Sequence, residues 1–234
     1  MDKVAAGIVD KLSIIGFFNV IISGGVLLYG ISPILDRYAP GIFYMNLSLE
    51  KDLEKGIILC LVCYIMGSAM QSIQALFFKG LKAGIVNKCL LGMQKTGSDL
   101  PEEGVLANRF KREDIAAMAA KLFADKNLGE FDPEDPVMCQ YFFDYCEYSN
   151  SIKGYSGRAD RLSESAAFYE QLTVAFYALV VIGIVYMLVA RVNVWIYCLG
   201  YLAMGTVFMG RAYHCRLNWA RTVLSTYEVV TDQE

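Results

Sequence analysis

The stretch "GIILCLVCYIMGSAMQSIQALFF", Gly56–Phe78, decides the fold, because its 23 residues contain no charged side chain. A helix needs about 20 predominantly apolar residues to cross the hydrocarbon core of a bilayer. Only helices and closed barrels satisfy their backbone hydrogen bonds in that environment, and an apolar run this continuous is typical of a helix. The stretch therefore predicts a transmembrane helix.

Three further stretches have the same character: Leu12–Leu35, Gln171–Ala190 and Val192–Gly210. Each of the four is 19 to 24 residues long, in a chain that is 56% hydrophobic and 19% charged. In globular domains, about a quarter of the residues are charged. The sequence predicts an all-α integral membrane protein with four transmembrane helices, arranged as two hairpins.

The two hairpins are separated by a polar segment with helical periodicity and are followed by an amphipathic tail, which gives the chain four parts. These are a first transmembrane hairpin at 1–80 (spans 12–35 and 56–78), a helical insert at 81–166, a second hairpin at 167–210 (spans 171–190 and 192–210) and a C-terminal helix and tail at 211–234.

The distribution of basic residues predicts the orientation in the membrane. Seventeen of the 21 Lys and Arg residues lie in the N-terminal segment, between Lys79 and Glu170, or in the tail, and four lie in the two short loops inside the hairpins. Cytoplasmic loops carry the excess of Lys and Arg. Both termini, the insert and the C-terminal helix are therefore expected in the cytoplasm.

One half of the second span carries polar and small side chains, and the bulky apolar side chains fall on the other half. The first span shows a weaker version of this pattern. The stripe comprises Asn19, Ser23, Gly67, Ser68, Gln71, Ser72 and Gln74. Small and hydrogen-bonding residues at one face let membrane helices approach closely, and polar linings also form pores between several copies. Both interpretations, helix packing and a pore wall, stay open.

A second group of candidates lies in the cytoplasmic parts, as a site for a ligand or a protein partner: Tyr141, Tyr145, Tyr148, Arg158, Arg161, His214, Arg216 and Arg221. The tyrosines share one helical face and suit either an aromatic pocket or core packing. The arginines before the third span suit either phosphate binding or anchoring at the membrane edge. Arg216 falls on the apolar side of the tail, which we expect to pack on the insert, and a buried arginine needs a polar partner there.

The sequence indicates no catalytic residue, metal site or cofactor, and no nucleic-acid partner. The CxxC at Cys60 and Cys63 is poorly suited to zinc in a chain with one histidine. The acidic loop between Glu130 and Asp135 lacks the spacing of an EF-hand. No ionisable residue lies inside a predicted span, which disfavours ion-coupled transporters and intramembrane acid–base enzymes.

The layout resembles that of small bacterial four-helix membrane effectors, including those of anti-phage systems, in architecture and without any matched residue. This resemblance implies a channel-like or effector-like role in bacterial defence, at the inner membrane. We expect a non-enzymatic homo-oligomer in the lipid bilayer, whose cytoplasmic part senses a ligand or partner and gates or perturbs the membrane. Two alternatives stay open: an anchor or scaffold for a cytoplasmic partner, and a membrane-bound enzyme with a cytoplasmic site.

Overall fold

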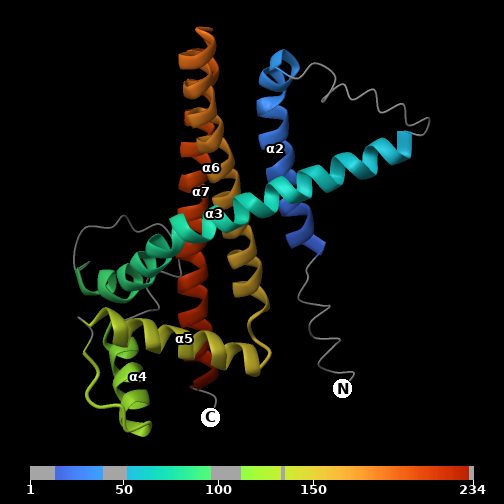
Figure 1. Cartoon of the computed structure of the whole chain (residues 1–234). Helices are drawn as coiled ribbons and strands as arrows, with labels where there is room; N and C mark the ends of the chain where they lie inside the picture. The colour runs from blue at the N-terminus through green and yellow to red at the C-terminus, as the bar shows by residue number, and fades with distance from the viewer. Residues whose placement is uncertain (1–13, 39–51, 96–111, 133–134, 232–234) are drawn as a thin grey trace. The chain divides into compact units, whose positions relative to one another are not determined.

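The computed structural model describes residues 14–38, 52–95, 112–132 and 135–231, and every regular element in these ranges is an α-helix (Figure 1). In chain order they are α2 (Ile14–Tyr38), α3 (Asp52–Lys95), α4 (Arg112–Asp125), α5 (Pro136–Ile152), α6 (Gly157–Ala190) and α7 (Trp195–Thr231). The all-helical fold class is thereby confirmed for these ranges. The portions of the predicted spans and domains that fall on 1–13, 39–51, 96–111, 133–134 and 232–234 lie outside the described residues.

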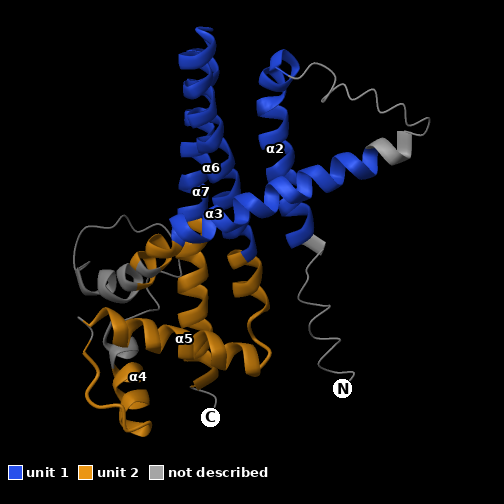
Figure 2. Ribbon diagram, in the orientation of Figure 1, with its two compact units in different colours: residues 1–78, 164–213 blue, residues 79–163, 214–234 orange. Residues whose placement is uncertain are grey.

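The chain divides into two compact units (Figure 2). Unit 1 comprises Met1–Phe78 and Glu164–Tyr213, and unit 2 comprises Lys79–Ser163 and His214–Glu234. The tail after residue 213 thus belongs to the same unit as the insert. Helices α3, α6 and α7 each contribute residues to both units.

Among the described residues, three segments are long and apolar enough to cross a membrane: Gly16–Tyr38, Gly56–Val86 and Gly157–Ala190. They contain the described parts of the first three predicted spans. The fourth predicted span, Val192–Gly210, is helical only from Trp195, where α7 begins, and is not among them. Two tyrosines, three glycines and a threonine between positions 195 and 210 lower its mean hydropathy. The structure is therefore that of a helical protein with three membrane-compatible helices.

In unit 1, α6 and α7 form an antiparallel pair joined by a short turn. The turn contains Arg191, whose φ is 52°. The rings of Phe176 and Phe208 stack at 5.5 Å with 11° between their planes. Gly183 lies against the sulfur of Cys198, so that a Cβ added at this glycine would come within 2.6 Å of it. A small residue therefore allows the close approach of the two helices.

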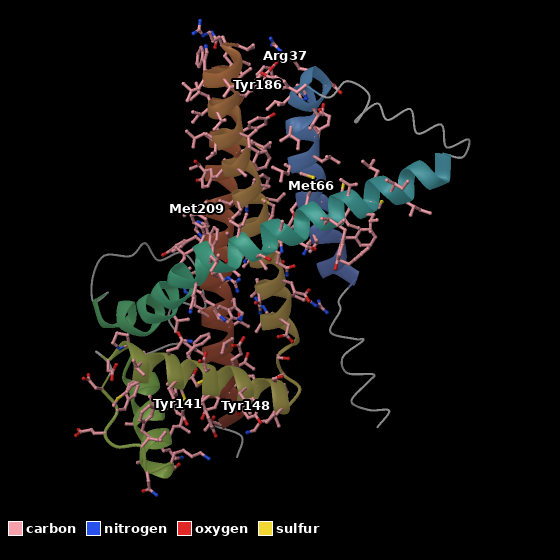
Figure 3. All side chains as sticks on the ribbon, viewed as in Figure 1. Arg37, Met66, Tyr141, Tyr148, Tyr186 and Met209 are labelled. Atoms are coloured by element: carbon pink, nitrogen blue, oxygen red, sulfur yellow. The ribbon has the colours of Figure 1, made fainter. Side chains whose placement is uncertain are left out.

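Helices α2 and α3 also approach each other closely, through glycines on both sides. A Cβ added at Gly24 would overlap the carbonyl oxygen of Cys63, and one added at Gly67 would overlap the carbonyl oxygen of Val20. At the end of α2, Arg37 Nη1 donates a hydrogen bond to the Tyr186 hydroxyl of α6 at 3.3 Å (Figure 3). Unit 1 is thus a bundle in which α3 and α6 both pack on α2.

In unit 2, the bounds of α5 follow from its capping residues. The Asp135 carboxylate accepts a hydrogen bond from the Val137 amide at 2.8 Å, which satisfies one of the free donors at the helix start. Pro136 occupies the first turn, where its missing N–H costs nothing. Beyond the helix end, Gly154 has a φ of 77°, which a residue with a Cβ rarely adopts.

The C-terminal part of α7 packs on α5, as the amphipathic tail predicts. The rings of Phe143 and Trp219 meet edge to face at 4.9 Å. The Asn150 amide donates a hydrogen bond to the Val223 carbonyl at 2.8 Å. All four residues are buried. This contact between segments far apart in the sequence forms the core of unit 2.

Candidate functional site

The interior of unit 1 contains a buried pair formed by an amide and a carboxyl group. Gln74 Nε2 of α3 donates a hydrogen bond to Glu170 Oε2 of α6 at 2.5 Å. The two side chains are 8% and 1% exposed. A buried polar group needs a hydrogen-bond partner, because leaving it unsatisfied costs free energy. Gln74, one member of the predicted polar stripe, is thereby held against another helix.

Further polar side chains beside Glu170 are also buried. Gln171 is 3% exposed, and its Oε1 atom is buried without a hydrogen-bond partner. The Thr173 hydroxyl donates to the Tyr169 carbonyl one turn earlier at 2.8 Å. Unit 1 therefore holds uncommonly polar material in its interior, whereas large apolar side chains such as Leu76 and Leu188 are exposed. Buried polar side chains together with many exposed large apolar ones suit a bundle that lipid surrounds.

The other members of the predicted stripe have different environments. The hydroxyls of Ser23, Ser68 and Ser72 donate to carbonyls of their own helices, those of Val20, Tyr64 and Ser68, at 3.0, 2.9 and 3.2 Å. Asn19 is partly buried, and Gly67 lies at the contact with α2. Gln71 is exposed, although it is only three residues from Gln74. The stripe thus separates into a buried part and an exposed part.

Unit 2 contains a cluster of charged groups around a buried indole. Lys82 Nζ lies 5.0 Å from the ring centroid of Trp219, and Arg216 Cζ lies 5.6 Å from it. Both distances permit cation–π attraction. Arg216 is buried, and its Nη1 donates a hydrogen bond to Ser163 Oγ at 3.2 Å. This arginine therefore contacts a hydroxyl group and an aromatic ring.

Glu147 of α5 completes this cluster. Burial is the largest influence on its carboxyl group and raises its pKa above the ordinary value, and Asp144 and Asp160 raise it further. The opposite charges of Lys82 and Arg216 lower the pKa and do not cancel the increase. The folded protein therefore favours the neutral form of Glu147 more than water does. We call Lys82, Glu147, Arg216 and Trp219 the charged cluster.

The raised pKa has a consequence for stability. Below about pH 4.3, the ordinary pKa of glutamate, the group is protonated in the folded and the unfolded chain alike. As the pH rises through the interval up to the raised pKa, the unfolded chain ionises first and the folded state loses stability. Glu147→Gln is therefore expected to raise the melting temperature at neutral pH, with a smaller gain in acid. Thermal unfolding in detergent at several pH values measures this.

Asp125→Asn serves as the control for that experiment, because Asp125 is an exposed carboxylate at the end of α4. It is expected to leave the melting temperature unchanged. A lower melting temperature for Glu147→Gln at neutral pH would mean that the attraction of Lys82 and Arg216 outweighs the cost of burial.

The remaining predicted cytoplasmic candidates are not gathered into one pocket-like cluster. Tyr141 and Tyr148 are exposed on α5, as Figure 3 shows, whereas Tyr145 packs against Tyr227 with ring centroids 6.2 Å apart. The side chains of Arg158, Arg161, His214 and Arg221 are exposed. Within the described ranges, no group of three or more His, Cys, Asp or Glu residues is arranged to hold a metal ion.

Sequence reasoning missed Glu170 and the charged-cluster partners Lys82, Glu147 and Trp219. Glu170 directly precedes the uncharged stretch that begins at Gln171, so it was treated as the boundary of a span. The structure places it inside α6, as the first residue of the buried run from Glu170 to Ala175. A helical projection that included Glu170 would have placed it on the same helix as the uncharged stretch and so within reach of a neighbouring helix.

Comparison with known proteins found no match: no family model, no curated protein and no solved structure matches the sequence.

Proposed function

We propose that the chain is a non-enzymatic integral membrane protein that assembles into a homo-oligomer and gates or perturbs the membrane. In this proposal α2, α3, α6 and the first half of α7 span the bilayer, and both termini and unit 2 lie in the cytoplasm. The observation that carries the proposal is the distribution of polarity in unit 1. Glu170 and Gln171 are buried there, while Leu76, Phe77 and Leu188 are each at least 77% exposed.

The placement of the charged cluster supports a sensing role for unit 2. Lys82 follows the last unit 1 residue of α3 by four positions, and Arg216 follows the last unit 1 residue of α7 by three. A change of charge at Glu147 therefore acts on two helices that continue into unit 1. Because helices transmit displacement along their axes, this arrangement suits a trigger in unit 2 that acts on the spanning helices.

The exposed part of the polar stripe supports the idea of a shared conduit. Gln71 and Ser72 are exposed on α3 in a unit whose surface is otherwise rich in apolar side chains. An exposed glutamine is costly against lipid and is better accommodated where copies meet around water. Asn19 and Ser68, which are partly buried, lie at the margin of this group.

Flux from vesicles tests the proposal. Full-length protein is reconstituted in vesicles of phosphatidylethanolamine and phosphatidylglycerol loaded with potassium or carboxyfluorescein, and its mass in detergent is measured in parallel. We expect an oligomer whose efflux rises when the pH is lowered through the titration of Glu147. The Glu147→Gln variant is expected to show the high efflux at neutral pH. An oligomer that leaks neither solute at any pH would favour the alternative function, an anchor for a cytoplasmic partner.

The proposed orientation has its own test. A single cysteine introduced at Ser48 is expected to react with a membrane-impermeant maleimide added outside intact cells, and one at Ser225 is expected to react only after lysis. These positions lie in the first outer loop and in the C-terminal helix of the proposed topology. Reaction of Ser225→Cys in intact cells would reverse the orientation.

A further inference from the structure

We propose that α5 carries a self-complementary surface through which unit 2 pairs with a second copy of the chain, the two α5 helices running antiparallel. This inference rests on the proposed homo-oligomer and names the contact that would hold its cytoplasmic parts together. The surface consists of five side chains that are between 46% and 75% exposed: Val137, Tyr141, Tyr148, Ile152 and Tyr155.

Four of the five side chains form one continuous stripe on α5. The spacings of four, seven and four residues between Val137, Tyr141, Tyr148 and Ile152 place them within about 60° of one another on a helical projection. Tyr155 follows the helix end, beyond Gly154, whose φ is 77°. Figure 3 shows Tyr141 and Tyr148 on α5. The opposite face is already buried in unit 2, by Phe142, Phe143 and Cys146 among others. The helix α5 is therefore apolar on two faces, of which unit 2 covers one.

Read from either end of α5, the stripe begins with an aliphatic side chain and continues with a tyrosine. Val137 and Tyr141 at the start correspond to Ile152 and Tyr148 at the end, about a midpoint between positions 144 and 145. A twofold axis at this midpoint places Val137 of one copy against Ile152 of the other, and Tyr141 against Tyr148. Closed twofold pairing of this kind requires a self-complementary patch. Paired tyrosine rings contribute beyond their buried area.

The charges at the two ends of α5 favour the same arrangement. Asp135 directly precedes the helix and Lys153 directly follows it. Each charge also suits the dipole of its own helix. In an antiparallel pair, Asp135 of each copy lies beside Lys153 of the other, whereas a parallel pair would bring like charges together. Charge complementarity across an interface selects the orientation of the partners.

The composition of α5 argues against lipid as the occupant of this surface. Helices that lie on anionic membranes are rich in Lys and Arg on their polar face. The segment Pro136–Ile152 contains neither, and it carries Asp144 and Glu147. An anionic lipid surface therefore repels this helix.

The charge at the centre of the stripe makes the pairing weak and reversible. Asp144 is exposed at the margin of the stripe and accepts a hydrogen bond from Gln140 Nε2 at 2.7 Å. The twofold axis brings the two copies of this carboxylate near each other, which opposes association. A stable interface buries about 800 Å² on each partner, more than one helical stripe supplies, so confinement in the same membrane supports the contact.

Cysteine cross-linking in native membranes tests the arrangement. Val137→Cys and Ile152→Cys chains carrying different tags are co-expressed and treated with a short bismaleimide. We expect a cross-linked pair that contains both tags. Val137→Cys expressed alone is expected to give no pair, because two such positions lie 15 residues apart along the antiparallel helices, or about 22 Å. The unmodified chain controls for the native cysteines. Those on α5, Cys139 and Cys146, are buried, which raises the pKa of both thiols and suppresses their reaction.

A second experiment uses charge. Tyr141→Arg combined with Tyr148→Arg places four positive charges at the centre of the pair and is expected to weaken association of the full-length protein in lipid vesicles at least tenfold. Asp144→Asn is expected to strengthen it. Ala124→Arg, an exposed position on α4, serves as the matched control. Tyr141 also meets the ring of Phe123, with centroids 5.7 Å apart, so Tyr148→Arg alone is made as well. Tyr148 is 65% exposed, and its single variant is expected to weaken association with little change in melting temperature.

The outcomes separate this inference from the proposed function. Efficient linking of Val137→Cys to itself would overturn the α5 pairing, as would unchanged association of the variant with both arginines. In either case the homo-oligomer would be held by contacts in unit 1. Linking to an unrelated protein in place of a second copy would also overturn the α5 pairing. A full-length protein that is monomeric in detergent and in membranes would contradict both proposals.

Discussion

Replacement of Gly24 by alanine is expected to separate α2 from α3 and to lower the stability of unit 1 by about 3 kcal/mol, because overpacking a tight contact costs 1–3 kcal/mol and occasionally more. The added Cβ would overlap the carbonyl oxygen of Cys63, which is backbone and cannot rotate away. The loss of the helix contact also exposes the buried Ser23. Resistance to unfolding by SDS, followed by circular dichroism, measures the effect.

The neighbouring glycine provides a matched control. A Cβ added at Gly25 meets only the Cys63 sulfur at 3.8 Å, an ordinary van der Waals distance. Gly25→Ala is therefore expected to be tolerated, with a small gain from the higher helix propensity of alanine. Gly67→Ala on the facing helix is expected to match Gly24→Ala, since its Cβ would overlap the Val20 carbonyl. Equal stability of the Gly24 and Gly25 variants would show that the two backbones do not meet at this point.

Gln74→Leu is expected to destabilise unit 1 by about 1–3 kcal/mol, the cost of removing one partner from a buried hydrogen bond. The leucine removes the donor that Glu170 Oε2 accepts from and leaves the carboxyl group buried without it. Gln71→Leu provides the matched control, because Gln71 is exposed one turn earlier on the same helix. It is expected to change stability by less than about 0.5 kcal/mol, as exposed substitutions do.

A double-mutant cycle isolates the pair. If the hydrogen bond carries the effect, the cost of Gln74→Leu falls once Glu170→Leu has removed the acceptor. If the destabilisation of the double variant equals the sum of the two single destabilisations, the two side chains do not interact. The same variants bear on function. Gln71→Leu is expected to reduce efflux from vesicles while stability is kept, because a leucine at an exposed polar position dewets a conduit.

Much of the secondary structure follows from local sequence. The absence of proline after Phe78 predicts that the helix continues beyond the span, and α3 does continue to Lys95. Gly129 is predicted to end the helix before it, but α4 ends at Asp125 and is closed by Asn127, whose φ is 53° and whose amide donates to the Ala124 carbonyl. The apolar face of the tail predicts its packing in unit 2, where Trp219 and Val223 are buried. In these cases the residues that predict a helix end or an apolar face lie within a few positions of it.

The polar sites depend on contacts that periodicity does not encode. A helical projection places Gln71 and Gln74 on the same half of α3, yet one is exposed and the other is buried against Glu170, which is 96 positions away. The charged cluster likewise joins Lys82, Glu147 and Arg216 from three helices.

The sequence by itself determined that this protein is helical, that its apolar helices suit a membrane and that α3 has one polar and one bulky half, because each of these depends on side-chain type at a fixed helical repeat. Only the tertiary structure decided which polar side chains of that half are buried, where the glycines bring two backbones together, and that Glu170 belongs to the interior of unit 1. Each of those outcomes depends on which helix lies opposite a given side chain, and the packing of the helices against one another determines that.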